Sequence, residues 1–227
     1  MADKFVVLVE GADDYHVIQH LLTVHGVDKQ IRYRLEGHPT AKFVSEEEVV
    51  FKDKKGITNV RAYLSQQLRI TGEMQAIGVI VDADLDISAS WQSLRDILIK
   101  SGYLDVPKVP DPYGLILEQE EKPRVGLWVM PNNALPGMTE DFISLLVPPN
   151  NPLWERARLS VDQIPAAERL FGENAAIKAH VHTWLAWQKI PGLPMGQAIN
   201  NRWLNPDAPE AVRLVKWLRR LFELKSD

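Results

Sequence analysis

An uncharged apolar segment that ends in closely spaced carboxylates restricts the fold of this chain more than any other feature. Residues 76–81 read AIGVIV, and aspartates then follow at every second position, at Asp82, Asp84 and Asp86. A short charge-free run of Val and Ile is typical of a strand that is buried on both faces in a parallel sheet. Open α/β sheets bind ligands beyond the carboxyl ends of such strands. The pattern therefore predicts an α/β fold with acidic side chains at the carboxyl edge of its sheet.

The three aspartates have two interpretations. Carboxylates this close repel one another unless a cation neutralises them, and Mg²⁺ prefers hard oxygen ligands of this kind. Alternatively, Asp82 and Asp86 shape the turn after the strand, with Asp86 near the start of the next helix. A second acidic group elsewhere in the chain would favour the metal interpretation.

Such a group follows the first predicted strand. Residues 4–9 read KFVVLV, and Glu10 comes next, at the same edge of a parallel sheet as Asp82. Gly11 allows a sharp turn into a helix. Asp14 falls in the first helical turn on the side of Val17 and Ile18, so it can face the same crevice as Glu10. Asp13 is explained by the favourable interaction of an acid with a helix N-terminus. That effect gives no reason for Glu10, so the metal interpretation is favoured.

Strand and helix patterns alternate over the first two thirds of the chain. This alternation predicts a mostly parallel sheet with helices on both faces. Helices are predicted at 12–25 and 57–70, and a third is predicted after the aspartates, capped by Ser88 or Ser90. Strands are predicted at 4–9, 31–35, 76–81, 113–117 and 124–130, with a short strand at 49–51 inside the charged, irregular segment 40–56. From about residue 142 onward only helices separated by prolines are expected. We predict an α/β domain at 1–147 and a helical extension at 148–227 packed on it.

Composition limits the class of protein. The 30 acidic and 26 basic residues give a net charge of −4, without the basic balance of proteins that bind nucleic acid mainly by neutralising phosphates. The absence of cysteine excludes disulfides and thiolate metal sites. Because neither a signal peptide nor a membrane-spanning run is evident, we expect a cytoplasmic protein. The local basic group is expected to form the exposed face of a terminal helix: Lys216, Arg219, Arg220 and Lys225.

Two short motifs resemble a known family. Val-Glu-Gly at 9–11 and Asp-Ala-Asp at 82–84 resemble the Toprim domain of topoisomerases, bacterial primases and related nucleases, over about residues 4–145. The resemblance implies a Rossmann-like sheet on which Glu10, Asp82 and Asp84 hold one or two Mg²⁺ or Mn²⁺ ions for phosphodiester chemistry.

Further residues extend the resemblance. Asp14, four residues after Glu10, resembles the two-metal branch of overcoming-lysogenization-defect nucleases. Residues 129–142 resemble a little-characterised family of stand-alone bacterial Toprim-like proteins. By this resemblance Glu140 binds the second metal and Lys178 neutralises charge on the reacting phosphate. From the residues alone, Thr139 is a helix N-cap with Glu140 in the first turn, and Lys178 is an exposed helical lysine.

The sequence thus predicts a divalent-metal-dependent phosphodiesterase, a nuclease that acts on DNA or RNA. Two alternatives stay open: a non-catalytic module that binds metal or nucleic acid, and a nuclease subunit that a partner such as an ATPase activates. The chain has no G-x-x-x-x-G-K-[ST] loop of its own. The predicted catalytic residues are Glu10, Asp82, Asp84 and Lys178, and the predicted metal ligands are Glu10, Asp14, Asp82, Asp84, Asp86 and Glu140.

Overall fold

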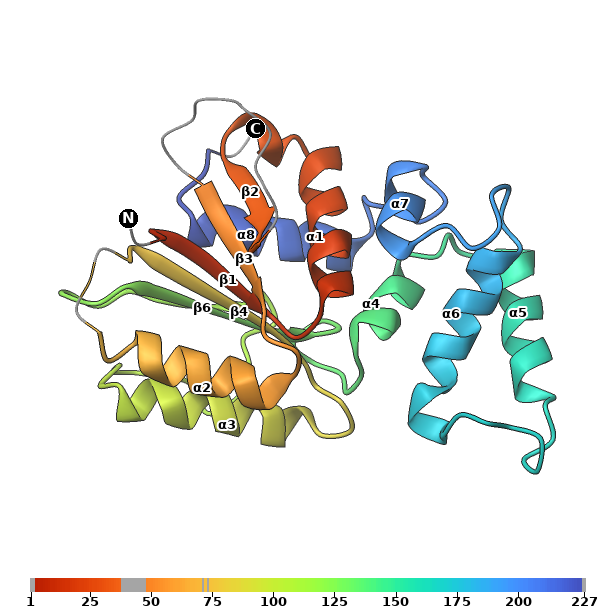
Figure 1. Cartoon of the computed structure of the whole chain (residues 1–227), viewed down its shortest axis with the longest axis horizontal. Helices are drawn as coiled ribbons and strands as arrows, with labels where there is room; N and C mark the ends of the chain where they lie inside the picture. Colours follow the sequence, from red (N-terminus) through yellow and green to blue (C-terminus); the bar gives the residue numbers. More distant parts are fainter. Residues whose placement is uncertain (1–2, 38–47, 71, 73, 226–227) are drawn as a thin grey trace.

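The chain forms a six-stranded sheet with helices on both faces (Figure 1). The computed structural model describes residues 3–37, 48–70, 72 and 74–225. The strand order is β2-β3-β1-β4-β6-β5, in which β5 alone of these described strands runs antiparallel to its neighbour. The predicted α/β class is therefore confirmed. The strands are β1 (Phe5–Val9), β2 (Arg32–Leu35), β3 (Glu48–Asp53), β4 (Ala76–Asp82), β5 (Leu115–Leu117) and β6 (Arg124–Met130).

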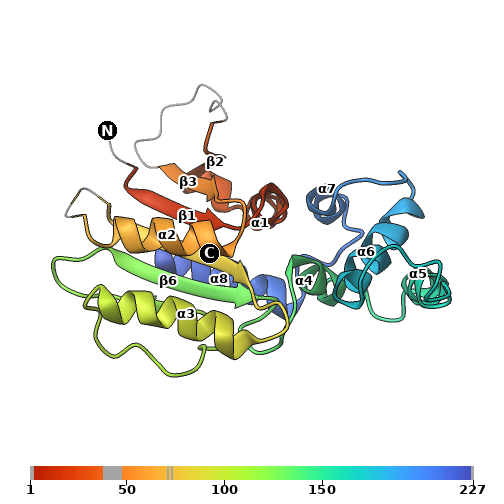
Figure 2. The same ribbon diagram turned by 60° about the horizontal axis from the view of Figure 1, so that its bottom comes forward.

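Helices α2 (Ile57–Gln67) and α3 (Ile87–Lys100) lie on one face of the sheet, and α1 (Ala12–Val24) and α8 (Pro209–Leu221) lie on the other (Figure 2). Helices α5 and α6 form a pair that projects to one side of the sheet (Figure 1). Among the described helices, none has the length and apolarity needed to cross a bilayer. The remaining helices are α4 (Thr139–Leu145), α5 (Pro152–Asp162), α6 (Ala176–Ala186) and α7 (Met195–Asn200), with 3-10 turns at Val27–Lys29 and Glu173–Ala175.

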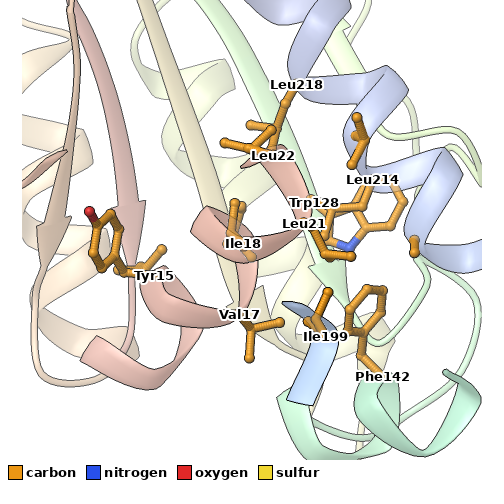
Figure 3. Close-up of a cluster of buried hydrophobic side chains, with 14 of the residues drawn as sticks. Tyr15, Val17, Ile18, Leu21, Leu22, Trp128, Phe142, Ile199, Leu214 and Leu218 are labelled. Atoms are coloured by element: carbon orange, nitrogen blue, oxygen red, sulfur yellow. The ribbon is translucent and has the colours of Figure 1, made fainter. Parts of the chain in front are cut away.

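Two apolar cores result from the alternation of side chains along each strand. In β1, Val6 and Leu8 pack toward α2 and α3, whereas Val7 and Val9 pack toward α1 and α8. All five residues of β1 are buried, as the charge-free sequence predicts. Figure 3 shows how α1, α8 and the sheet meet around Trp128. These cores hold the strands rigidly, so the residues at the strand ends are placed by the sheet and not by a loose loop.

Helix α8 packs on the sheet through Trp217, although it belongs to the predicted helical extension. A methyl group added at Gly126 would lie 2.8 Å from the Trp217 ring, and one at Gly78 would lie 2.9 Å from Leu221. The indole Nε1 of Trp217 donates a hydrogen bond to the backbone oxygen of Leu115, at 2.9 Å. Glycine in β4 and β6 therefore makes room for α8, which is part of the α/β layers.

Some predicted elements differ from the observed ones. The predicted short strand at 49–51 is the six-residue strand β3, which pairs with both β1 and β2. The predicted strand at 113–117 begins only at Leu115. Arg219 is buried and donates to the backbone oxygen of His25 at 2.8 Å, so it is not part of an exposed basic face. Residues 38–47, which include the first part (40–47) of the segment predicted to be irregular, lie outside the described part of the chain.

The predicted helix caps were also wrong. Helix α3 begins after Asp86, whose Oδ1 accepts from the N–H groups of Ser88 and Ala89 at 2.9 and 3.1 Å, so neither Ser88 nor Ser90 is the cap. A carboxylate caps better from the position before the helix than a serine inside its first turn. Helix α4 has Met138 at its cap position and Thr139 as its first residue.

Candidate functional site

The ends of β1 and β4 bring two of the predicted acids side by side. These strands are parallel neighbours, so Glu10 and Asp82 emerge at the same carboxyl edge. Oε1 of Glu10 accepts a hydrogen bond from the backbone N–H of Asp82 at 2.9 Å. The N–H of Gly56, which follows β3, donates to the backbone oxygen of Glu10 at 3.0 Å. Glu10 is therefore fixed between two strand ends.

Helix α1 adds a third carboxylate. The chain turns at Gly11, and the backbone N–H of Gly11 donates to Oδ2 of Asp14 at 2.9 Å. Asp14 is buried, with 8% of its surface exposed. Its other oxygen, Oδ1, accepts from the hydroxyl of Thr139 at 2.6 Å. This contact joins residues 125 positions apart, and it orients Asp14 toward the strand ends.

Helix α4 supplies a fourth carboxylate and a contact to the helical pair. The backbone N–H of Thr139 donates to Oδ1 of Asp82 at 3.1 Å. The next residue, Glu140, is buried, and its Oε1 lies 3.5 Å from Nζ of the half-exposed Lys178 on α6. These residues line one pocket of about 330 Å³, together with Gly11, Ala12, Asp13 and Gly56.

Asp84 lies beside this pocket. Its N–H donates to the backbone oxygen of Gly137 at 2.9 Å, and the N–H of Gly137 donates back at 2.7 Å. Asp84 has a φ of 52°, a left-handed conformation that aspartate tolerates better than most residues. It borders an adjoining groove of about 520 Å³ with Leu85, Met138 and Ile177. Burial is the main cause of the raised pKa values of Glu10 and Asp82, and the charge of Asp84 adds to it.

The structure does not bring Asp86 into this group. Its carboxylate caps α3, as described above, and it is absent from the residues that line the acidic pocket. The interpretation of Asp86 as a helix-start residue is the one that its geometry supports.

Burial and mutual repulsion give the cluster unusual electrostatics. Burial, followed by the nearby charges of Asp14, Glu10 and Glu140, raises the pKa of Asp82 to about 8. Burial likewise raises the pKa of Glu10, against the lowering effect of its hydrogen bond from the N–H of Asp82. Burial raises the pKa of Asp14, and the hydrogen bond from Thr139 opposes that increase. The pocket thus concentrates negative charge that its protein contacts only partly offset.

Comparison with known proteins identifies the family. The model of a family described as "Protein of unknown function (DUF3226)" matches residues 4–223. The chain belongs to this family. No curated protein and no solved structure gives a significant match. The DUF3226 match spans both the sheet and the helical pair, so the matched region includes both Lys178 and the acidic residues at the sheet edge.

In this DUF3226 protein, two contributors to the site were not predicted from sequence. Thr139 was expected only to cap a helix, yet its hydroxyl contacts Asp14. Residues Gly56 and Ile57, at the start of α2, approach Glu10 through backbone N–H groups. A signal for them exists in retrospect: both follow strands at the same carboxyl edge, where parallel strands gather their loops.

Proposed function

We propose that this protein is a divalent-metal-dependent phosphodiesterase that cleaves DNA or RNA at the acidic pocket. The observation that carries the proposal is the hydrogen-bonded group of Glu10, Asp14 and Asp82 at one sheet edge, where the pKa of Asp82 is raised to about 8. Strongly shifted carboxyls in a pocket are typical of functional sites. A hard cation would offset the repulsion that shifts them.

The donor chemistry fits Mg²⁺ or Mn²⁺. All the candidate ligands in the pocket are carboxylate oxygens, from Glu10, Asp14, Asp82 and Glu140, with Asp84 at its border. Among the described residues, no three Asp, Glu, His or Cys side chains stand as a ready-made ligand set. Mg²⁺ does not require such a set, because it commonly keeps several waters and takes one or two carboxylates directly, so the other acids would hold it through its waters. When bound, the ion would supply an activated water and offset charge at the phosphate.

The fold supports the Toprim resemblance. A mostly parallel sheet carries Glu10 and the Asp82-x-Asp84 pair at the ends of adjacent strands, as that resemblance implies. Asp14 and Glu140 share the pocket with them, in agreement with the two-metal nuclease branch. The proposal that this chain has a Toprim-like site depends on this juxtaposition.

The acidic residues and Lys178 would have different roles in the reaction. Glu10, Asp82 and Asp84 would hold the ion, and Asp14 and Glu140 would hold a second one. The side chain of Lys178 is half exposed at the pocket, and its Nζ lies 3.5 Å from Oε1 of Glu140, so it can also approach a phosphate oxygen. A positive charge there would stabilise the negative charge that develops as the phosphodiester is cleaved.

The test is cleavage of single- and double-stranded DNA and RNA by purified protein with Mn²⁺, Mg²⁺ or EDTA. We expect slow, metal-dependent cleavage with little sequence preference, and binding that weakens with salt. Lys178→Ala should lower kcat about tenfold with little change in KM, because a contact made in the transition state acts on the chemical step.

Matched variants identify other outcomes. Cleavage that is undiminished in Asp84→Asn comes from a contaminant and refutes the proposal. Mn²⁺ binding without cleavage of any substrate favours the non-catalytic binding module. Cleavage that requires an added ATPase or other partner favours the partner-activated subunit.

A further inference from the structure

We infer that Thr139 is a positioning residue that fixes Asp14 relative to Asp82 for ion binding. This inference rests on the proposed function, because it assigns Thr139 a role toward the same ion. It goes beyond the acidic residues themselves, since Thr139 supplies no charge. It rests on two hydrogen bonds from one buried residue to two carboxylates that belong to different elements of the fold.

The geometry of Thr139 is that of a bridge. Its hydroxyl donates to Oδ1 of Asp14 on α1 at 2.6 Å, and its backbone N–H donates to Oδ1 of Asp82 at the end of β4 at 3.1 Å. Only 4% of its surface is exposed, so water does not compete freely for these contacts. A hydroxyl has a single O–H to donate, and here that proton goes to Asp14. The separation of the two carboxylates is therefore set by one residue.

The hydroxyl of Thr139 is not needed to begin α4. The N–H of Met138, at the cap position of this helix, donates to Oδ2 of Asp141 at 2.8 Å. A threonine that caps a helix would instead accept from a backbone N–H of its own helix. Because the hydroxyl of Thr139 donates to Asp14 on α1, it serves the acidic pocket.

The bridge also leaves acceptor capacity on the acids. Each carboxylate oxygen can accept about two hydrogen bonds. In Asp14, Oδ1 accepts one from the Thr139 hydroxyl and Oδ2 accepts one from the N–H of Gly11. The remaining lone pairs are available to an ion or its waters. Partners that orient the ligands of a metal in this way typically change its affinity about 10–100-fold when they are removed.

The experiment compares Thr139→Val, which keeps the shape but removes the donor, with Thr139→Ser, which keeps the donor. Ser144→Ala is the matched control, because the Ser144 hydroxyl lies on the same helix and donates to the backbone oxygen of Asp141 at 2.7 Å. Calorimetric titration measures Mn²⁺ affinity, and melting of the metal-free protein measures stability.

We expect Thr139→Val to weaken Mn²⁺ binding about 10–100-fold, while Thr139→Ser and Ser144→Ala bind within about threefold of wild type. In an Asp14→Asn background, Thr139→Val should weaken binding little further, because the two residues act as a unit. Cleavage by Thr139→Val should show a lower kcat at unchanged KM for the nucleic acid.

Two results overturn the inference. One is wild-type Mn²⁺ affinity in Thr139→Val, whether or not its melting temperature falls. The other is failure of Thr139→Ser to restore affinity. If Thr139→Val does not fold, Thr139→Ala provides the same comparison. Failure of the proposed function is recognised separately: wild-type protein then binds no Mn²⁺, or Asp82→Asn binds it as wild type does.

Discussion

Charged side chains are arranged in opposite ways at the two ends of the sheet. At the amino end, Arg124 begins β6 and donates to Glu118 at 2.9 Å, to Glu223, and to the backbone oxygen of Leu221 at 3.2 Å. The hydrogen bond from Arg124 holds the pKa of Glu223 below its ordinary value. At the carboxyl end, acids face one another, and the pKa of Asp82 is raised.

Both ends form open pockets, of about 490 Å³ around Arg124 and about 330 Å³ around Asp82, so the presence of a cavity does not distinguish them. The difference is whether the charges are matched within the protein. Matched charges stabilise the fold modestly, whereas like charges on partly buried carboxyls cost stability. The comparison is therefore consistent with the proposal that the carboxyl end binds a ligand of opposite charge.

The largest expected effect is on ion binding. Asp82→Asn and Glu10→Gln should each weaken Mn²⁺ binding at least about 100-fold, more than the loss of a residue that only orients a ligand. Calorimetric titration measures this. Arg124→Gln, at the other end of the sheet, is the control and should bind Mn²⁺ as wild type does. Equal loss in all three variants would show that binding reports general damage and not a site.

The next effect is a dependence of stability on pH in the metal-free protein. The pKa of Asp82 is about 8 in the folded state against an ordinary 3.8, so the folded state holds a proton that the unfolded state has released over this range. Stability should therefore fall as pH rises from about 4 to about 8, and then level off. We expect the free energy of unfolding to fall by about 2–3 kcal/mol. This is less than the shift of one isolated group would give, because the carboxyls titrate as a coupled set.

Urea unfolding in EDTA at pH 5, 7 and 9 measures this slope. Asp82→Asn should flatten it, since the variant has no carboxyl to titrate at this position. A wild-type stability that rises between pH 5 and pH 8, with the same rise in Asp82→Asn, would contradict the predicted electrostatics.

Neutralising one charge should change the stability of the protein in opposite directions at the two ends of the sheet. At pH 9 without metal, Asp82→Asn should raise the free energy of unfolding by about 1–2 kcal/mol, because it relieves repulsion and burial of charge. Arg124→Gln should lower the melting temperature instead, because Glu118 and the Leu221 oxygen lose their donor. Thermal melting of both variants beside wild type measures the two signs. The same sign in both would remove the distinction between the ends.

The smallest effect separates Asp86 from the acidic pocket. Asp86→Ala should cost about 1 kcal/mol of stability through loss of the α3 cap, while Mn²⁺ affinity stays as in wild type. Melting and titration of the same sample measure both quantities. A large loss of Mn²⁺ affinity would return Asp86 to the set of ligands.

The predictable part of the molecule is the part that depends on local pattern. The apolar run before Asp82 identifies a buried strand, and the carboxyl ends of parallel strands share an edge, so Glu10 and Asp82 are found from sequence. Spacing along the chain does not give the direction of a side chain, and Asp86 consequently received a ligand role although it caps a helix.

The contacts that sequence could not predict join distant segments. Thr139 reaches Asp14 across 125 positions, and no local pattern reports that pair. Glu140 and Lys178 were connected only by resemblance, and their contact depends on how α6 packs beside α4. Trp217 lies in the helical extension that was predicted to pack on the α/β domain, but the sequence did not show that the glycines of β4 and β6 make room for it on the sheet.

The position of α8 in the chain determines when, during synthesis, one face of the sheet can be completed. Residues 209–221 are made long after the strands that carry Glu10 and Asp82, and α8 then completes the face of the sheet on which α1 also packs. A chain that stops at residue 147 lacks Trp217, which packs against Trp128, and Leu221, which packs against Gly78 and Gly126. The strands that carry the acidic edge therefore precede, in the order of synthesis, the helix that completes one face of their sheet.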